Sequence, residues 1–251
     1  MSRRLCTFCP EPATTGEHIW SDWLNALLGK DRRYRINREI QGDARHWHSV
    51  GLHQKLPVLC DGCNNNWGSV IETRMKDVSS FMVRDGTPTH LKSKDLATIA
   101  LYSQLKAFVC DYAQEEIKSF YELSERRAFR NISRFPSGTN MWLARTLPNH
   151  GIFRNAYAKP PFNTPKRFHT YVFTMSLGHL VIQLTSVRWT KKSNRRYAIP
   201  PQLTQGPAWN RVSVPIWPDC ITPIYWPPQE QLGREGLNSF FNRWTLVNRV
   251  D

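Results

Sequence analysis

The stretch "CDGCNNNWGSVIE", residues 60–72, decides how the first part of this chain folds. Two cysteines three residues apart stand directly before three asparagines and a segment whose apolar residues recur at helical spacing. A CxxC turn is typical of a pair of metal ligands. An asparagine that follows such a turn can cap the helix or supply an oxygen ligand. The role of this stretch therefore depends on which other residues of the chain meet it.

A second CxxC pair, Cys6 and Cys9, lies near the N-terminus, well before Cys60 and Cys63. Four thiolates can close a tetrahedral zinc site with bonds of about 2.3 Å. Ordinary buried cysteines or two disulfides are the alternative, which we disfavour because short CxxC turns suit one metal better than two strained crosslinks. Four cysteines leave no open coordination position, so we expect a structural Zn²⁺ that takes no part in catalysis.

The composition favours a polyanionic partner. The chain has 251 residues, 40% of them hydrophobic, with a net charge of +14 and a pI near 9.8. Such a basic, core-forming chain is typical of proteins that bind nucleic acid, and we expect DNA rather than RNA. No apolar segment approaches the roughly 18 residues that a membrane span needs. The start, "MSRRLCTFCP", lacks the apolar core of a secretory signal, so we expect a cytoplasmic protein with no membrane partner.

The spacing of apolar residues predicts an α+β protein. We expect a short helix between Ser21 and Gly29, a hairpin over residues 32–50, and a helix from residue 64 whose buried face carries Trp67, Val70, Ile71, Met75 and Val78. A linker is predicted at residues 85–93, so that residues 1–84 form one unit and residues 93–251 a second, basic one. In the second unit we predict helices at 95–113, 118–131 and near 237–244, and strands from 141 onward, two of them joined by a turn at "LGH", residues 177–179.

The N-terminal unit resembles the zinc-stapled HNH endonucleases, the ββα-metal nuclease family. The resemblance is carried by "CTFC" at 6–9, "EH" at 17–18 and "CDGCN" at 60–64, in the family's order. It covers a little over a quarter of the chain. It implies a ββα-metal fold for residues 1–84, followed by a mixed helix and strand domain, and a metal-dependent endonuclease that hydrolyses phosphodiester bonds in DNA.

Carried over residue by residue, the resemblance implies three catalytic roles. His18 would be the general base, because an imidazole keeps a neutral fraction near neutral pH. Glu17 and Asn64 would ligate a divalent cation, Mg²⁺ or Mn²⁺, which prefers oxygen ligands. Other interpretations stay open: Glu17 and His18 could be an ordinary surface pair, and Asn64 could be only a helix cap, with Asn65 or Asn66 as the ligand instead.

One position departs from the family pattern. The middle asparagine of the family corresponds to Lys55 here. Lysine could contact the phosphate directly, and His53 could replace the asparagine in part. The "HWH" at 46–48 could also supply a ligand, although surface histidines are the simpler interpretation. The departure supports an alternative function, a catalytically inactive zinc-stabilised module that binds nucleic acid.

Two basic clusters lie in the second unit and are predicted to neutralise phosphates. The first recurs at helical spacing and the second lies between proline-rich loops; the residues are Arg126, Arg127, Arg130, Lys191, Lys192, Arg195 and Arg196. A solvated face without a partner is the alternative for either cluster. Nuclease modules that cut both strands often pair, so a homodimer is one expected assembly.

Overall fold

The computed structural model describes most of the chain. It covers residues 4–29, 33–40, 43–50, 53–113, 119–158, 168–189 and 206–243, with residues 33–49, 148–158, 168–169 and 189 described by their backbone only. The fold mixes helices and strands, as an α+β protein does. None of the helices in these ranges combines the length and apolar character that crossing a bilayer requires.

The N-terminal part consists of two antiparallel strands followed by a helix. Strand β1 (Thr15–His18) pairs with β4 (Lys55–Leu59), and His18 lies opposite Lys55. A π-helical segment, η1 (Gly62–Gly68), then continues directly into α2 (Ser69–Asp85). Between the two strands lie α1 (Asp22–Leu28) and a hairpin of β2 (Arg33–Ile40) and β3 (Asp43–Val50). The predicted short helix and the predicted hairpin are thus confirmed.

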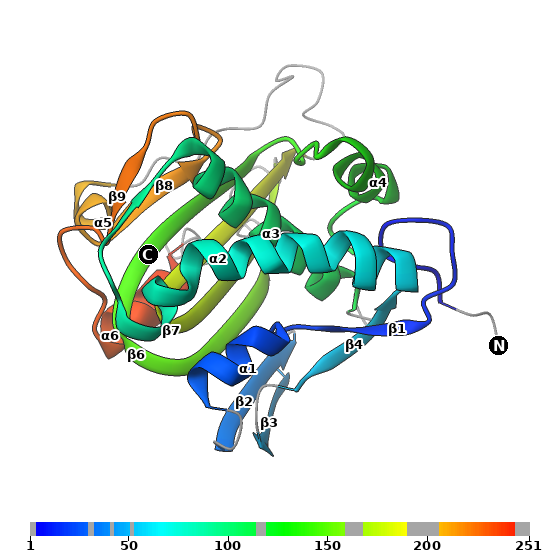
Figure 1. The fold of residues 1–251 in the computed structure, drawn as a ribbon, viewed down its shortest axis with the longest axis horizontal. Coiled ribbons are helices and arrows are strands. Elements are labelled where there is room, and N and C mark those ends of the chain that lie inside the picture. The colour runs from blue at the N-terminus through cyan, green and yellow to red at the C-terminus, as the bar shows by residue number, and fades with distance from the viewer. Residues whose placement is uncertain are drawn as a thin grey trace.

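The remainder is built on a three-stranded antiparallel sheet of β6 (Thr139–Ala158), β7 (Phe168–Trp189) and β8 (Ser213–Trp217), in the order β7-β6-β8. Helices α2 and α3 (Ser93–Tyr112) lie across one face of the sheet and α6 (Arg234–Asn242) packs behind it (Figure 1). The smaller elements are α4 (Leu123–Ile132), α5 (Pro207–Val212), and β5 (Thr89–Leu91) paired with β9 (Ile224–Trp226).

Several local predictions are wrong. The segment 85–93 contains strand β5 and is not a plain linker. The asparagines do not cap the helix, because it begins at Gly62, before all three of them. Val70 is exposed, since η1 and α2 together shift the buried face of the helix.

The predicted turn at residues 177–179 is also absent, because β7 continues through it. Gly178 has a φ of +56° and lies opposite an irregular stretch of β6, so the strand bends there without ending. A Cβ atom at this position would lie 2.1 Å from the carbonyl oxygen of Val83 in α2. Glycine is therefore required where the helix meets the strand, although glycine is also common in turns.

A single hydrophobic cluster extends over both predicted units. It includes Phe8 beside the first cysteine pair, Met75 in α2, and Phe108 in α3. The Phe8 ring lies 5.0 Å from the Trp67 ring and 5.8 Å from the Phe108 ring, centroid to centroid. The N-terminal strands and helix are therefore packed directly against the helices of the second predicted unit.

Candidate metal centre and histidine site

The two CxxC turns bring four sulfur atoms together. The Sγ atoms of Cys6, Cys9, Cys60 and Cys63 all lie within 4.8 Å of one another. The Cys9 sulfur is 3.5 Å from that of Cys60 and 3.8 Å from that of Cys63. A tetrahedral zinc site with bonds of about 2.3 Å separates its sulfurs by about 3.8 Å. The cluster can therefore hold a structural metal such as zinc.

Main-chain hydrogen bonds and one arginine support this cluster. Thr7 N donates to Val58 O at 2.9 Å and Asn64 N donates to Cys60 O at 3.0 Å, which fixes the two turns. The hydrogen bond from Cys63 lowers the pKa of the Cys6 thiol to about 4, while burial raises that of Cys9 to about 11. Cys6 and burial raise the pKa of the Cys63 thiol, and the Arg130 guanidinium, 4.9 Å from the Trp67 ring, opposes them. Four thiolates around Zn²⁺ leave a net negative charge, which Arg130 offsets.

His18 lies at the end of β1, with its ring largely shielded from solvent. Its Nε2 atom is 3.1 Å from the Asp22 carboxylate on the first turn of α1. Burial lowers the pKa of His18, and the charges of Lys55 and Lys106 lower it further, against the opposing effect of Asp22. The imidazole is therefore neutral at pH 7. When Nε2 donates to Asp22, the Nδ1 lone pair is the one that can accept a proton.

Glu17 faces the opposite way, into the core. Its side chain is buried and forms an ion pair with Lys106 of α3. Lys106 Nζ also donates to the Glu72 carboxylate at 2.6 Å and to the carbonyl oxygen of His18 at 2.6 Å. Burial raises the pKa of Glu17 despite Lys106. Burial opposes ionisation of Glu72 as well, but Lys106 outweighs it and lowers the pKa of that carboxyl.

Sequence reasoning missed Lys106, Glu72 and Asp22. Lys106 could have been found from the sequence, because it is the one charged residue between Asp95 and Asp111 in an apolar helix. A lone lysine in such a position indicates a buried ammonium with acidic partners. Nothing in the sequence names those partners, which lie 89 and 34 positions away.

Asn64 is half-buried and fastens the start of the long helix to β1. Its Nδ2 donates to Thr15 Oγ1 at 3.0 Å and lies 3.4 Å from Gly16 O. These contacts are two to three residues from His18, roughly 7–10 Å along a strand. The structure thus brings Asn64 to the same strand as His18 and Glu17 but turns the Glu17 carboxylate towards Lys106. Asn65 and Asn66 are exposed.

The predicted phosphate contacts divide into four groups. Arg126 is buried, and its guanidinium donates to Thr7 O at 3.0 Å and Tyr121 O at 2.8 Å, so it ties α4 to the first cysteine turn and is not available at the surface. Arg127 and Lys55 are exposed, while Arg130 lies against the metal centre. The second cluster, Lys191, Lys192, Arg195 and Arg196, falls outside the described residues.

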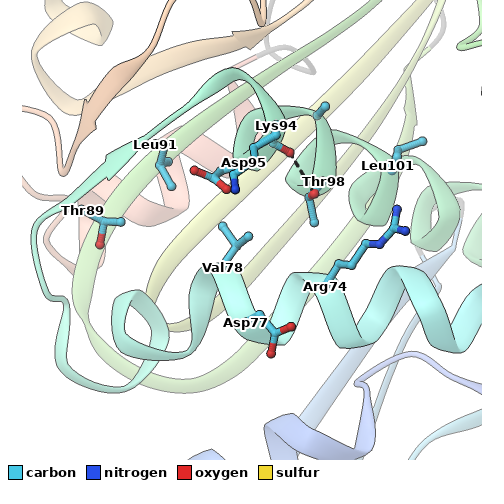
Figure 2. Close-up of a pocket in the computed structure, with 10 residues that line it drawn as sticks. Arg74, Asp77, Val78, Thr89, Leu91, Lys94, Asp95, Thr98 and Leu101 are labelled. Carbon is cyan, nitrogen blue, oxygen red and sulfur yellow. Dashed lines mark hydrogen bonds between the residues drawn. The ribbon is translucent and has the colours of Figure 1, made fainter.

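A surface hollow of about 690 Å³ lies between α2 and the first turns of α3. Figure 2 shows Arg74 and Asp77 on one side and Lys94 and Asp95 on the other. The Asp95 carboxylate accepts a hydrogen bond from the Lys92 amide at 2.9 Å and so caps α3. Charges of both signs do not favour a polyanion, so the histidine site remains the candidate for chemistry.

Comparisons with protein-family models, with curated proteins and with solved structures found no match.

Proposed function

We propose that this protein is an HNH-type endonuclease that hydrolyses phosphodiester bonds in DNA, with His18 as the general base. The observation that carries the proposal is the His18–Asp22 pair: a neutral imidazole, oriented by a carboxylate 3.1 Å away. His18 ends a strand fastened by the cysteine cluster and by Asn64, and Asp22 begins the helix that follows. The order of strand, strand and helix also agrees with the resemblance to the ββα-metal nucleases.

The site residues have distinct roles in this proposal. His18 Nδ1 takes a proton from the attacking water, whose oxygen bonds to phosphorus as the ester bond to the leaving oxygen breaks, and the leaving oxygen takes a proton from solvent. Asp22 stabilises the imidazolium that forms. Lys55, exposed and opposite His18 on β4, offsets the charge of the scissile phosphate. Asn64 holds β1 against the helix, and the exposed Arg127 adds electrostatic attraction for the DNA backbone.

Mg²⁺ or Mn²⁺ would stabilise the developing charge on the leaving oxygen when bound. The ligands inferred from the sequence fit such an ion poorly, because the Glu17 carboxylate is already paired with Lys106. The proposed steps therefore use His18 and Lys55 and do not depend on a cation at Glu17.

Substituting His18→Ala should lower the rate of plasmid cleavage by about 10²- to 10⁴-fold, the usual contribution of a general base. Zinc-loaded protein would be incubated with supercoiled plasmid in Mg²⁺ and in Mn²⁺, and nicked and linear products followed on gels. The rate should rise with pH to a plateau, with a midpoint below the ordinary histidine pKa because burial lowers it in His18. His90→Ala, which removes an exposed histidine of β5, is the matched control. Equal cleavage by wild type and His18→Ala would end the proposal.

A second function is favoured by the Glu17–Lys106 pair itself. A chain that neutralises the expected metal ligand could retain the scaffold as a zinc-stabilised module that binds nucleic acid without cutting it. Such a module would retain DNA with a strong dependence on salt, yet release no products in either metal. The same plasmid assay, run beside a salt titration of DNA binding, separates the two functions.

A further inference from the structure

The ammonium group of Lys106 is enclosed by oxygen atoms from three directions. Nζ donates to Glu17 of β1, to Glu72 of α2 and to the main-chain oxygen of His18. The Lys106 side chain is completely buried. An ammonium has three N–H donors, and these three acceptors use all of them.

The neighbouring side chains hold this shell in place. Ser21 Oγ donates to Glu72 Oε1 at 2.5 Å, and it lies 3.1 Å from the hydroxyl of Tyr102. The Tyr102 ring centroid is 5.5 Å from Lys106 Nζ, so the ring covers the ammonium on a further side. The shell is therefore built from several elements and is not a chance contact between two long side chains.

A divalent ion and this ammonium cannot share Glu17. Two carboxylates and a carbonyl are the oxygen donors that a hard cation would use. An ion bound to the Glu17 carboxylate at about 2.1 Å would lie immediately beside the ammonium that the same carboxylate accepts. Two positive charges so close repel strongly in a buried site, where screening by water is weak.

We infer that the Lys106 ammonium is the permanent cation of the histidine site. It occupies the place that a divalent ion would take at Glu17, and it positions His18 by its hydrogen bond to the His18 carbonyl oxygen. Lys106 is thus a positioning residue. The inference rests on the proposed function for the role of His18, whereas the statement about cation binding concerns the free protein alone.

The test is Mn²⁺ binding to zinc-loaded protein without nucleic acid, followed by electron paramagnetic resonance. Glu17→Gln should leave the weak Mn²⁺ affinity of the otherwise wild-type chain unchanged within about twofold. Lys106→Met should tighten Mn²⁺ binding by at least about tenfold, because it removes a positive charge adjacent to two carboxylates. The double variant Lys106→Met/Glu17→Gln should lose that gain. Lys94→Met, an exposed lysine of the same helix, is the control and should change nothing.

Two results would overturn the inference. One is a tenfold or greater loss of Mn²⁺ affinity in Glu17→Gln, which would make Glu17 a ligand in spite of Lys106. This measurement needs no Lys106 variant, so it can be made even if Lys106→Met fails to fold. The other is a folded Lys106→Met protein with unchanged affinity. A chain that cuts no plasmid can still show the shift in Mn²⁺ binding, so failure of the proposed function is distinguishable from failure of this inference.

Discussion

Replacing Cys60 by serine should abolish binding of the expected structural zinc and unfold the N-terminal strands together with the helix that follows them. Structural zinc contributes about 10–16 kcal/mol in small zinc-binding peptides, whereas whole domains are stable by only about 5–15 kcal/mol. The cysteine cluster here joins the chain near residues 6–9 to the start of η1, and Phe8 beside it packs into the central core. Loss of the metal should therefore reach α2 and α3 and not remain local.

The measurements are metal content per chain and thermal unfolding followed by circular dichroism. The wild type should carry one zinc per chain, and Cys60→Ser should carry none and lose its cooperative transition. Cys220→Ser is the control, because Cys220 lies outside the cluster and its loss should leave the zinc in place. A Cys60→Ser protein that melts within a few degrees of the wild type would show that the fold does not need the metal.

The meeting of the two CxxC pairs could be predicted because their cysteines are recognisable metal ligands, whereas the other contacts between distant segments could not. The cysteine spacing predicts the cluster because the geometry of a CxxC turn is set within four residues. The partners of Lys106 were missed because they lie on other elements, and no periodicity along α3 identifies them. Glu17 directly precedes His18 in the chain, but the sequence could not show which way its side chain turns.

The arginines of α4 and the glycine of β7 illustrate the same limit. Helical spacing groups Arg126 with Arg130 on one side of a helix, yet it does not say whether that side meets water or the cysteine turns. The sequence predicts a turn at residues 177–179, where β7 instead continues through Gly178. Glycine is required at position 178 because the Val83 carbonyl of α2, far away in sequence, leaves no room for a Cβ atom.

Substituting Lys106→Met should destabilise the protein by about 3–5 kcal/mol at neutral pH, the usual cost of removing one partner from a buried ion pair. Burial alone would lower the pKa of Lys106, but Glu17 and Glu72 outweigh it and raise that pKa, so the ammonium stays charged in the folded wild type. In the variant the buried Glu17 carboxyl and the partly buried Glu72 carboxyl are left without a cation. The free energy of unfolding would be measured in urea on zinc-loaded protein, with Lys94→Met as the exposed control on the same helix.

The pH dependence of this loss distinguishes uncompensated charge from a simple packing defect. Without the ammonium, the folded-state pKa of Glu72 rises above its unfolded value and the already raised pKa of Glu17 rises further, so the folded protein binds more protons. Its stability then falls as pH rises towards those folded-state values and recovers on acidification. Glu72 has the opposite effect in the wild type. Its lowered pKa stabilises the protein at pH values above the pKa of the unfolded state, and this stabilisation is lost in acid. The two stability curves should therefore approach each other as pH falls towards those folded-state values. The comparison would be made at about pH 8 and about pH 6, with zinc content checked at each because metal binding to thiolates depends on pH. Changing both glutamates to glutamine in the Lys106→Met background should recover part of the lost free energy of unfolding. If Lys106→Met is destabilised equally at both pH values, Lys106 acts through packing and not through its charge.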